Sequence, residues 1–190
     1  MKPEQPFAVG PDGWLAGVRR LPSPHRDARP EGEEVSLLVI HGISLPPGEF
    51  GTGQVEALFT GRLDPAGHPA FAALAELRVS AHLFVDRQGA VTQFVSCAER
   101  AWHAGASCFA RRPRCNDFSI GIELEGTDLV PYSDEQYRIL VALTRALFAA
   151  YPALGLERIV GHRDIAPRRK SDPGLAFDWH RYLVALEGVR

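Results

Sequence analysis

The segment VGHRDIAPRRKSDPG, residues 160–174, gathers side chains that could do chemistry into one short stretch. It contains His162, the two carboxylates Asp164 and Asp172, and a run of basic residues. Another histidine, His41, follows an apolar run much earlier in the chain. Two imidazoles and one carboxylate form the ligand set that holds zinc in hydrolytic sites while a fourth position stays open for water. These residue types predict a metal site made of both histidines and one aspartate, and the spacing does not choose between the aspartates.

The remaining histidines divide into two groups. His25, His68 and His180 fall in the N-terminal segment or on predicted helices, where we expect them to be solvated. His82 and His103 lie in or just after the predicted central hairpin. Each of these two is expected either to make a hydrogen bond in the core or to line the same cleft as the metal site.

Apolar patterns predict the strands that position these residues. Residues 35–44 form a branched apolar run that is typical of a strand buried on both faces. Residues 80–95 read as two strands around the turn DRQG. Residues 117–126 alternate aliphatic side chains with glycine and glutamate, which places the glutamates on the opposite face from the aliphatic residues. The apolar stretch at 158–160 predicts a further strand just before His162.

Helices are predicted between these strands. Residues 131–152 carry apolar residues at helical spacing and begin with Ser133 and Gln136, a capping-box pattern. Shorter helices are expected at 53–63, 68–77 and 178–188. Helices interleaved with strands and a hairpin predict a single α/β domain, in which helices flank a mixed central β-sheet.

Length and composition limit the organisation of the chain. A chain of 190 residues with 45% hydrophobic residues is long enough for one domain with a sizeable core. Residues 1–34, rich in proline and arginine, are expected to form a strap packed on a domain that spans residues 35–190. The three cysteines match neither a metal motif nor a disulfide framework, so we expect reduced structural thiols.

Charge and hydropathy exclude several partners. The net charge of −2 predicts no general attraction to nucleic acid or to an anionic membrane. The N-terminus lacks an apolar signal region, and no stretch approaches the ~20 apolar residues that span a bilayer. We therefore expect a cytoplasmic protein with no membrane partner and no obligate protein partner.

Several motifs together resemble one known family. They are LLVIHGISLPPGEF, LRVSAHLFVDRQG, RAWHAGAS, RCNDFSIGIELEGTD, YPALGLERIVGHRDIAPRRKSDPG and FDW. In this order, from about Gly13 to about Leu183, they are similar to the zinc-dependent N-acetylmuramoyl-L-alanine amidases of type 2. Within that family the likeness is greatest to the cytoplasmic members that act on anhydromuramyl peptides during cell-wall recycling.

The resemblance implies a mixed sheet with one zinc ion at its end. By motif position the zinc ligands would be His41, His162 and Asp172, which leaves Asp164 as a nearby loop acid. Glu123 matches the catalytic glutamate of the family, and Lys170 matches its catalytic lysine. The implied reaction is hydrolysis of the amide between the lactyl group of anhydro-N-acetylmuramic acid and L-alanine. Glu123 would move protons, and Lys170 would stabilise the oxyanion.

Substrate contacts are also implied by motif position. Arg78 and Arg114 would hold the carboxylates of the peptide, because a guanidinium group can bind a carboxylate through two hydrogen bonds. Trp102 and His103 would contact the anhydromuramyl peptide. Gly42 departs from the pattern, since many relatives have asparagine there, and a side-chain hydrogen bond to the substrate would be missing.

Two alternative functions share these motifs. A lysin or autolysin would use the same chemistry on intact peptidoglycan. A catalytically inactive peptidoglycan-binding module would share the fold but typically lacks a metal ligand or a catalytic group. All five matching positions are filled in this sequence, which favours an enzyme.

Overall fold

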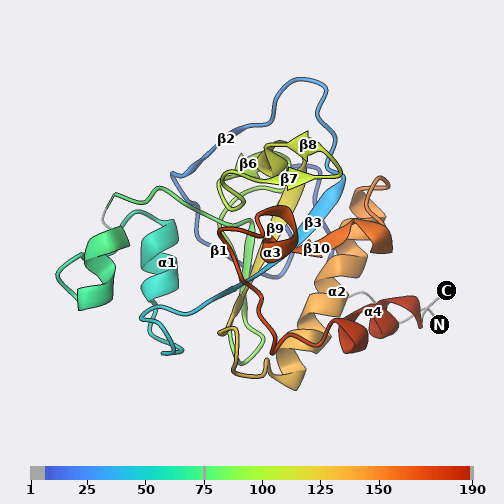
Figure 1. Ribbon diagram of the computed structural model, residues 1–190. Coiled ribbons are helices and arrows are strands. Elements are labelled where there is room, and N and C mark those ends of the chain that lie inside the picture. The colour runs from blue at the N-terminus through green and yellow to red at the C-terminus, as the bar shows by residue number, and fades with distance from the viewer. Residues whose placement is uncertain (1–6, 75, 189–190) are drawn as a thin grey trace.

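The computed structural model describes residues 7–74 and 76–188 and is built around a six-stranded sheet. Its strands are β1 (Arg19–Arg20), β5 (Val91–Gln93), β4 (Leu83–Val85), β9 (Ser119–Glu125), β3 (Leu37–Ile43) and β10 (Ile159–Gly161), in that spatial order (Figure 1). Strands β4 and β5 form the predicted antiparallel hairpin, and every other neighbouring pair is parallel. The expected α/β domain with a mixed central sheet is therefore confirmed.

The N-terminal segment takes part in this sheet. The first six residues of the expected strap lie outside the described residues. Further along, β1 pairs with the edge strand β5, and β2 (Arg26–Ala28) pairs with β6 (Glu99–Ala101). A second small sheet joins β7 (Cys108–Phe109) to β8 (Arg112–Pro113). The N-terminal segment thus pairs with the second strand of the hairpin and with the strand that follows the hairpin.

Helices flank the sheet as expected, although two of them differ from the prediction. The longest, α2 (Asp134–Ala150), begins with the predicted capping box, in which Ser133 and Gln136 exchange hydrogen bonds. The C-terminal helix is α4 (Trp179–Glu187), and α3 (His162–Ile165) is a single turn. The helix expected at 53–63 is only α1 (Gln54–Phe59), because the chain turns at Thr60 and the left-handed Gly61. The segment expected at 68–77 forms a 3-10 helix, Pro69–Leu74, and position 75 of that prediction lies outside the described residues. Two short 3-10 helices, Cys115–Asp117 and Leu156–Arg158, complete the set.

Each face of the sheet is buried by different elements. Helices α2 and α4 cover one face, where Leu38, Ile40, Ile120 and Ile122 join the largest apolar cluster. Figure 1 shows these two helices together on one side, with α1 on the other side of the sheet. The opposite face of β3 packs Leu37 and Val39 against Phe118 and Ile165, among others. Because both faces are covered, β9 is buried along its whole length, its two glutamates included.

The register of the parallel strands places polar groups in one row. His41 of β3 lies opposite Glu123 of β9, so both side chains leave the sheet on the same face. Ile40 lies opposite Gly161, the last residue of β10. His162, the next residue after Gly161, therefore comes level with His41. Strand pairing alone thus brings together residues that are far apart in the sequence.

Two further expectations concern the whole described chain. Among residues 7–74 and 76–188, no helix combines the length and the apolar character needed to cross a membrane. All three cysteines are free thiols, of which Cys97 and Cys115 are buried and Cys108 is exposed.

Candidate metal centre

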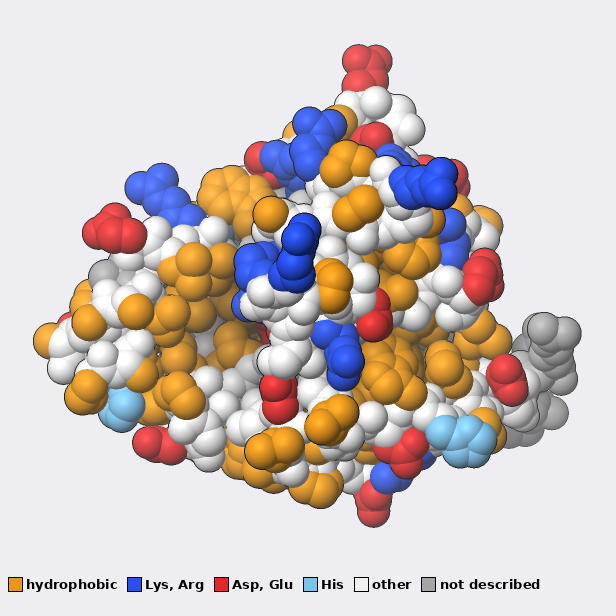
Figure 2. All heavy atoms as spheres, in the orientation of Figure 1, with side chains coloured by type: hydrophobic (Ala, Val, Ile, Leu, Met, Phe, Trp, Pro, Cys, Tyr) orange, Lys and Arg blue, Asp and Glu red, His pale blue; other side chains and the backbone are white. Residues whose placement is uncertain are grey.

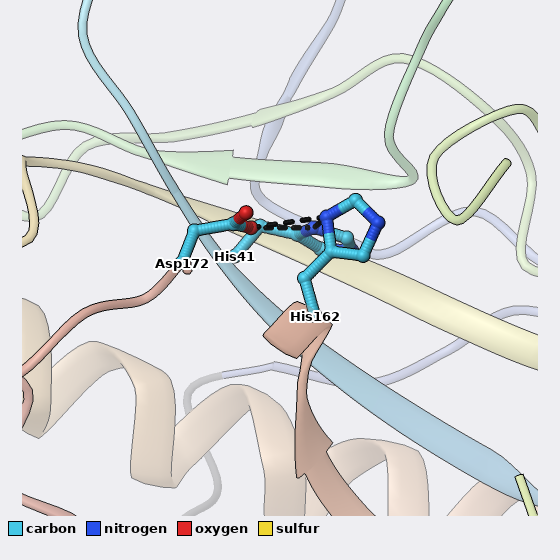
Figure 3. Close-up of side chains that lie close together, drawn as sticks. All are labelled: His41, His162 and Asp172. Carbon is cyan, nitrogen blue, oxygen red and sulfur yellow. Dashed lines mark hydrogen bonds and ion pairs between the residues drawn. The ribbon is translucent and has the colours of Figure 1, made fainter. Parts of the chain in front are cut away.

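Three ligand atoms from three segments converge at the row described above (Figure 3). The Nδ1 atom of His41 lies 3.0 Å from Nδ1 of His162. Both nitrogens lie 3.1 Å from Oδ2 of Asp172. His41 comes from β3, His162 opens α3, and Asp172 stands on the loop that leads to α4. The three atoms form a nearly equilateral triangle in a part of the molecule where both imidazoles are buried.

This geometry gives different partners to the two aspartates of residues 160–174. Asp164 accepts a hydrogen bond of 2.7 Å from the backbone N–H of Gly161 and so caps the start of α3. Asp172 faces both histidines instead. Burial by itself would raise the pKa of Asp172. The facing imidazoles of His162 and His41 lower this pKa by a larger amount, so that its net value lies below the usual one and the carboxyl group is ionised.

The surroundings of the two imidazoles favour forms that can bind a metal. Nε2 of His162 lies 3.2 Å from the carbonyl oxygen of Ala104, which can only accept a hydrogen bond. Nε2 therefore carries a proton, which in the neutral imidazole leaves the lone pair of Nδ1 available to a metal ion. Burial lowers the pKa of His41 to about 4, which keeps this imidazole neutral at pH 7.

This donor set fits a metal ion. Two imidazole nitrogens and a carboxylate oxygen that lie 3.0 to 3.1 Å from one another are the donor atoms of a three-ligand zinc site. Neutral imidazoles and an ionised carboxylate are also the forms in which these side chains bind zinc. The hydrogen bond of the second ring nitrogen to a carbonyl group is typical of histidine ligands.

Glu123 lies beside this centre with free hydrogen-bonding capacity. Its side chain is buried, with 8% of the residue exposed, and Oε1 lies 3.9 Å from Nδ1 of His41. Oε2 has no hydrogen-bond partner within the described chain. Burial and the nearby Asp172 raise the pKa of Glu123 well above its usual value, while Lys170 acts in the opposite direction. A buried carboxyl group of this kind is suited to taking up and releasing a proton.

The neighbouring glutamate of the same strand is engaged elsewhere. Glu125 points to the same face as Glu123, since the two are two residues apart on β9. Its Oε1 accepts a hydrogen bond of 2.5 Å from the backbone N–H of Gly51, and its Oε2 accepts one of 3.1 Å from that of Arg87. Glu125 therefore joins two loops and is not free to act on a ligand.

A cleft of about 330 Å³ opens over the centre, within the size range of roughly 300 to 1,000 Å³ that is usual for ligand sites. Glu123, Lys170 and Asp172 line it, together with apolar side chains such as Leu58 and Leu74 from the segments around α1. Figure 2 shows this face hollowed, with hydrophobic side chains on one side and Lys and Arg side chains on the other. The cleft can thus receive a ligand that has both apolar and anionic parts.

The two arginines expected to hold substrate lie outside the lining of this cleft. Arg78 is exposed and lines an adjoining cavity, which shares Leu58, Leu74 and Leu77 with the main cleft. The side chain of Arg114 is 79% exposed, and its Nε lies 3.1 Å from Oδ2 of Asp117. The structure therefore brings neither guanidinium group to the three ligand atoms.

The other two expected contact residues have partners within the protein. Nε1 of Trp102 donates a hydrogen bond of 3.0 Å to Asp27, and its ring stacks on that of His25. His103 lines the cleft but is buried, and its Nδ1 lies 2.9 Å from Nε2 of His41. His82 is a core histidine, because Gly121 N–H donates to its Nδ1.

One residue that sequence reasoning missed lies against the ligand loop. The hydroxyl group of Tyr132 donates a hydrogen bond of 2.9 Å to the carbonyl oxygen of Pro173, the residue after Asp172. A Cβ atom on Gly42 would lie 2.2 Å from this hydroxyl oxygen. The glycine that departs from the family pattern therefore leaves room for Tyr132. A glycine within a strand is the only signal of such a close approach that the sequence offers.

Comparisons with known proteins identify the family of the chain. A family model described as N-acetylmuramoyl-L-alanine amidase matches residues 31–175. The 1,6-anhydro-N-acetylmuramyl-L-alanine amidase AmpD of Escherichia coli (strain K12) is 59% identical over 174 residues, which cover 92% of this chain and 94% of that protein.

Solved structures are similar as well. A crystal structure of a selenomethionine AmpD derivative matches with a TM-score of 0.90 at 56% identity, covering 92% of this chain and 97% of that one. The amidase AmiD from E. coli, solved with anhydro-N-acetylmuramic acid-L-Ala-D-gamma-Glu-L-Lys, matches with a TM-score of 0.58 at 29% identity, covering 96% of this chain and 66% of that one. Because the family model spans most of the sequence, and a curated relative is more than half identical over nearly all of it, the chain belongs to the N-acetylmuramoyl-L-alanine amidase family.

Proposed function

We propose that the chain is a zinc amidase that hydrolyses the amide bond between the lactyl group of anhydro-N-acetylmuramic acid and L-alanine. Its substrates would be soluble fragments from peptidoglycan turnover. The observation that carries this proposal is the triangle of ligand atoms, 3.0 to 3.1 Å apart, beside a buried carboxyl group with an unpartnered oxygen. The 59% identity to AmpD over nearly the whole of both chains supports the substrate class.

His41, His162 and Asp172 would hold one zinc ion. When bound, zinc lowers the pKa of water to about 7 and polarises a carbonyl group. The remaining polar groups of the cleft are then available for proton transfer and charge stabilisation.

Glu123 and Lys170 would perform these two tasks. The carboxylate of Glu123 accepts a proton from the attacking water and passes it to the amine of L-alanine, which leaves poorly as an anion. The ammonium group of Lys170, which lines the same cleft, stabilises the negative charge that develops on the carbonyl oxygen of the lactyl group.

Substrate recognition would involve groups around the rim of the cleft. Arg78 and Arg114 are proposed to bind carboxylates of the peptide, since both are exposed and Arg78 lines the cavity that adjoins the cleft. The AmiD complex with an anhydromuramyl tripeptide supports a ligand of this class. Trp102 and His103 are weaker candidates, because both have partners inside the protein.

The proposed location is the cytoplasm, and the main alternative is a lysin that acts on intact peptidoglycan. To distinguish them, purified enzyme is given anhydromuramyl-tripeptide and whole sacculi in parallel, and the products are identified by mass spectrometry. We expect release of the tripeptide from the soluble substrate at a much higher rate. Faster release from sacculi would favour the lysin, and no release from either would favour a binding module.

The metal requirement is tested in the same assay. Removal of metal with a chelator should abolish release of the tripeptide, and addition of one equivalent of zinc should restore it. Activity that survives complete removal of metal would contradict the proposed zinc mechanism.

A further inference from the structure

His103 lies between a candidate metal ligand and a buried serine. Its Nδ1 lies 2.9 Å from Nε2 of His41, and its Nε2 lies 3.1 Å from Oγ of Ser119. All three residues are buried. The rings of His41 and His103 meet edge to face, with centroids 5.0 Å apart. Both nitrogens of His103 are therefore directed at protein groups, although its ring borders the cleft.

The protons on the hydrogen-bonded groups of His41, His103 and Ser119 can be arranged in two ways. In one arrangement His41 donates from Nε2 to Nδ1 of His103, and His103 donates from Nε2 to Ser119. Nδ1 of His41 is then bare and can bind a metal. In the other arrangement every proton is reversed, and Nδ1 of His41 carries a proton that points at His162 and Asp172. Since a metal-binding imidazole must offer a lone pair, only the first arrangement is compatible with the site.

The residue after His103 serves the second histidine ligand. The carbonyl oxygen of Ala104 accepts the hydrogen bond from Nε2 of His162, at 3.2 Å. Adjacent positions of one segment thus contact the outer nitrogen of both histidine ligands, one through a side chain and the other through the backbone. The orientation of both imidazoles depends on where this segment lies.

The fold fixes this two-residue segment from two sides. Oδ1 of Asn116 accepts hydrogen bonds from the backbone N–H groups of His103, at 3.2 Å, and of Ala104, at 2.7 Å. The ring of His103 rests on Gly121 of β9, where a Cβ atom would lie 2.5 to 2.9 Å from ring atoms. A glycine at this strand position is therefore required for the ring to reach His41.

We propose that His103 is a positioning residue for the metal, and that the segment 103–104 sets the tautomer and orientation of both histidine ligands. This role is distinct from the substrate contact expected from the sequence. The inference rests on the proposed zinc function, because it concerns the ligands of that ion. Partners of this kind typically contribute about 10- to 100-fold to metal affinity.

The test measures the zinc dissociation constant by competition with a chromophoric chelator. We expect His103→Ala to weaken zinc binding by about 10- to 100-fold. His103→Asn should recover most of this loss, since its amide oxygen can take the place of Nδ1 and accept the proton of His41. The visible spectrum of the cobalt-substituted protein should change in His103→Ala and return toward that of the wild type in His103→Asn.

A matched control separates positioning from general destabilisation. His82 is as buried as His103 and packs against its ring, with centroids 5.6 Å apart, but it contacts none of the three ligands. His82→Ala should lower the melting temperature of the metal-free protein and leave the zinc dissociation constant nearly unchanged. Asn116→Ala, which keeps both imidazoles and frees the segment, should weaken zinc binding.

The outcomes are distinguishable. Wild-type affinity in His103→Ala, no recovery in His103→Asn, or an equal loss in His82→Ala would each overturn the positioning role. If the wild-type protein itself binds no zinc, the proposed function fails, and not only this inference.

Discussion

At the scale of single residues, the two aspartates of residues 160–174 have separate tasks. Asp172 faces both imidazoles, whereas Asp164 accepts a hydrogen bond from Gly161 and caps α3. We expect Asp172→Ala to lose most of its zinc, because one of three ligands is removed, and Asp164→Ala to retain it. Metal analysis of the purified variants measures this. Full zinc content in Asp172→Ala together with loss in Asp164→Ala would show that the assigned ligand is wrong.

The two glutamates of β9, Glu123 and Glu125, are expected to differ in their effects on activity and on stability. Glu123→Gln should bind zinc and fold but lose about 10²- to 10⁴-fold in kcat, the usual contribution of a group that transfers protons. Glu125→Gln should retain most of its kcat and lose stability, because its carboxylate accepts hydrogen bonds from Gly51 and Arg87. Steady-state kinetics and urea denaturation measure the two effects. The opposite ranking in kcat would mean that Glu125 is the catalytic carboxylate.

At the scale of elements, one tyrosine links the ligand loop to the sheet. Tyr132 precedes α2, fills the space above Gly42 of β3 and donates a hydrogen bond to Pro173. Burial raises the pKa of its hydroxyl group, which therefore stays protonated and able to donate. The loop that carries Asp172 is thus held against the strand that carries His41.

The tyrosine can be compared with its neighbour Ser133, which caps α2. Tyr132→Phe leaves the buried carbonyl of Pro173 unsatisfied and should cost about 1 to 3 kcal/mol in the free energy of unfolding. Ser133→Ala removes a helix cap and should cost about 0.5 to 2 kcal/mol. Urea denaturation measures both, and chelator competition measures zinc affinity. Only Tyr132→Phe should weaken zinc binding; an equal effect in Ser133→Ala would show that Tyr132 has no special role.

Sequence reasoning succeeded where a local pattern determines an element. The hairpin β4–β5, the buried strands β3 and β9 and the capping box of α2 each follow from periodicity or turn chemistry in a short window. The helix expected at 68–77 did not follow, since its alanines favour an α-helix but the structure has a 3-10 helix at Pro69–Leu74, with Phe71 buried. Strands β1 and β2 are too short to show any period.

Less of the candidate site than of the fold could be predicted from the sequence. The ligand types of His41, His162 and Asp172 are visible in the sequence, but the choice of Asp172 required the family resemblance. The contact of His103 with His41 depends on how the loop after β6 folds over Gly121. No local pattern encodes this contact, since the residues come from three separate segments of the chain.

At the scale of the whole molecule, the proposed substrate contacts extend beyond the cleft over the candidate metal centre. Arg78 and Arg114 lie on different segments outside its lining. A charge-assisted hydrogen bond contributes about 1.5 to 3 kcal/mol, so each alanine variant should lose roughly ten- to a hundredfold in kcat/KM on the tripeptide substrate. The loss should shrink on a substrate that carries only L-alanine.

A matched arginine on the opposite side provides the control. Arg138 pairs with Glu135 three residues away, as Arg114 pairs with Asp117, but it belongs to α2, which covers the face of the sheet opposite to His41 and Glu123. Arg138→Ala should keep the kcat/KM of the wild type on both substrates. If Arg78→Ala and Arg114→Ala behave like Arg138→Ala, neither arginine binds the peptide.

The distance along the chain between His41 and His162, 121 positions, determines when metal can be captured. Neither histidine can meet the other until β10 has docked on β3, so a growing polypeptide has no high-affinity zinc site during most of its synthesis. An ion that binds only the completed fold stabilises it by mass action, by about 4.1 kcal/mol when free zinc exceeds the dissociation constant a thousandfold. In the proposed zinc enzyme, metal would therefore be captured late, after β10, which leads into His162, has paired with β3, which carries His41.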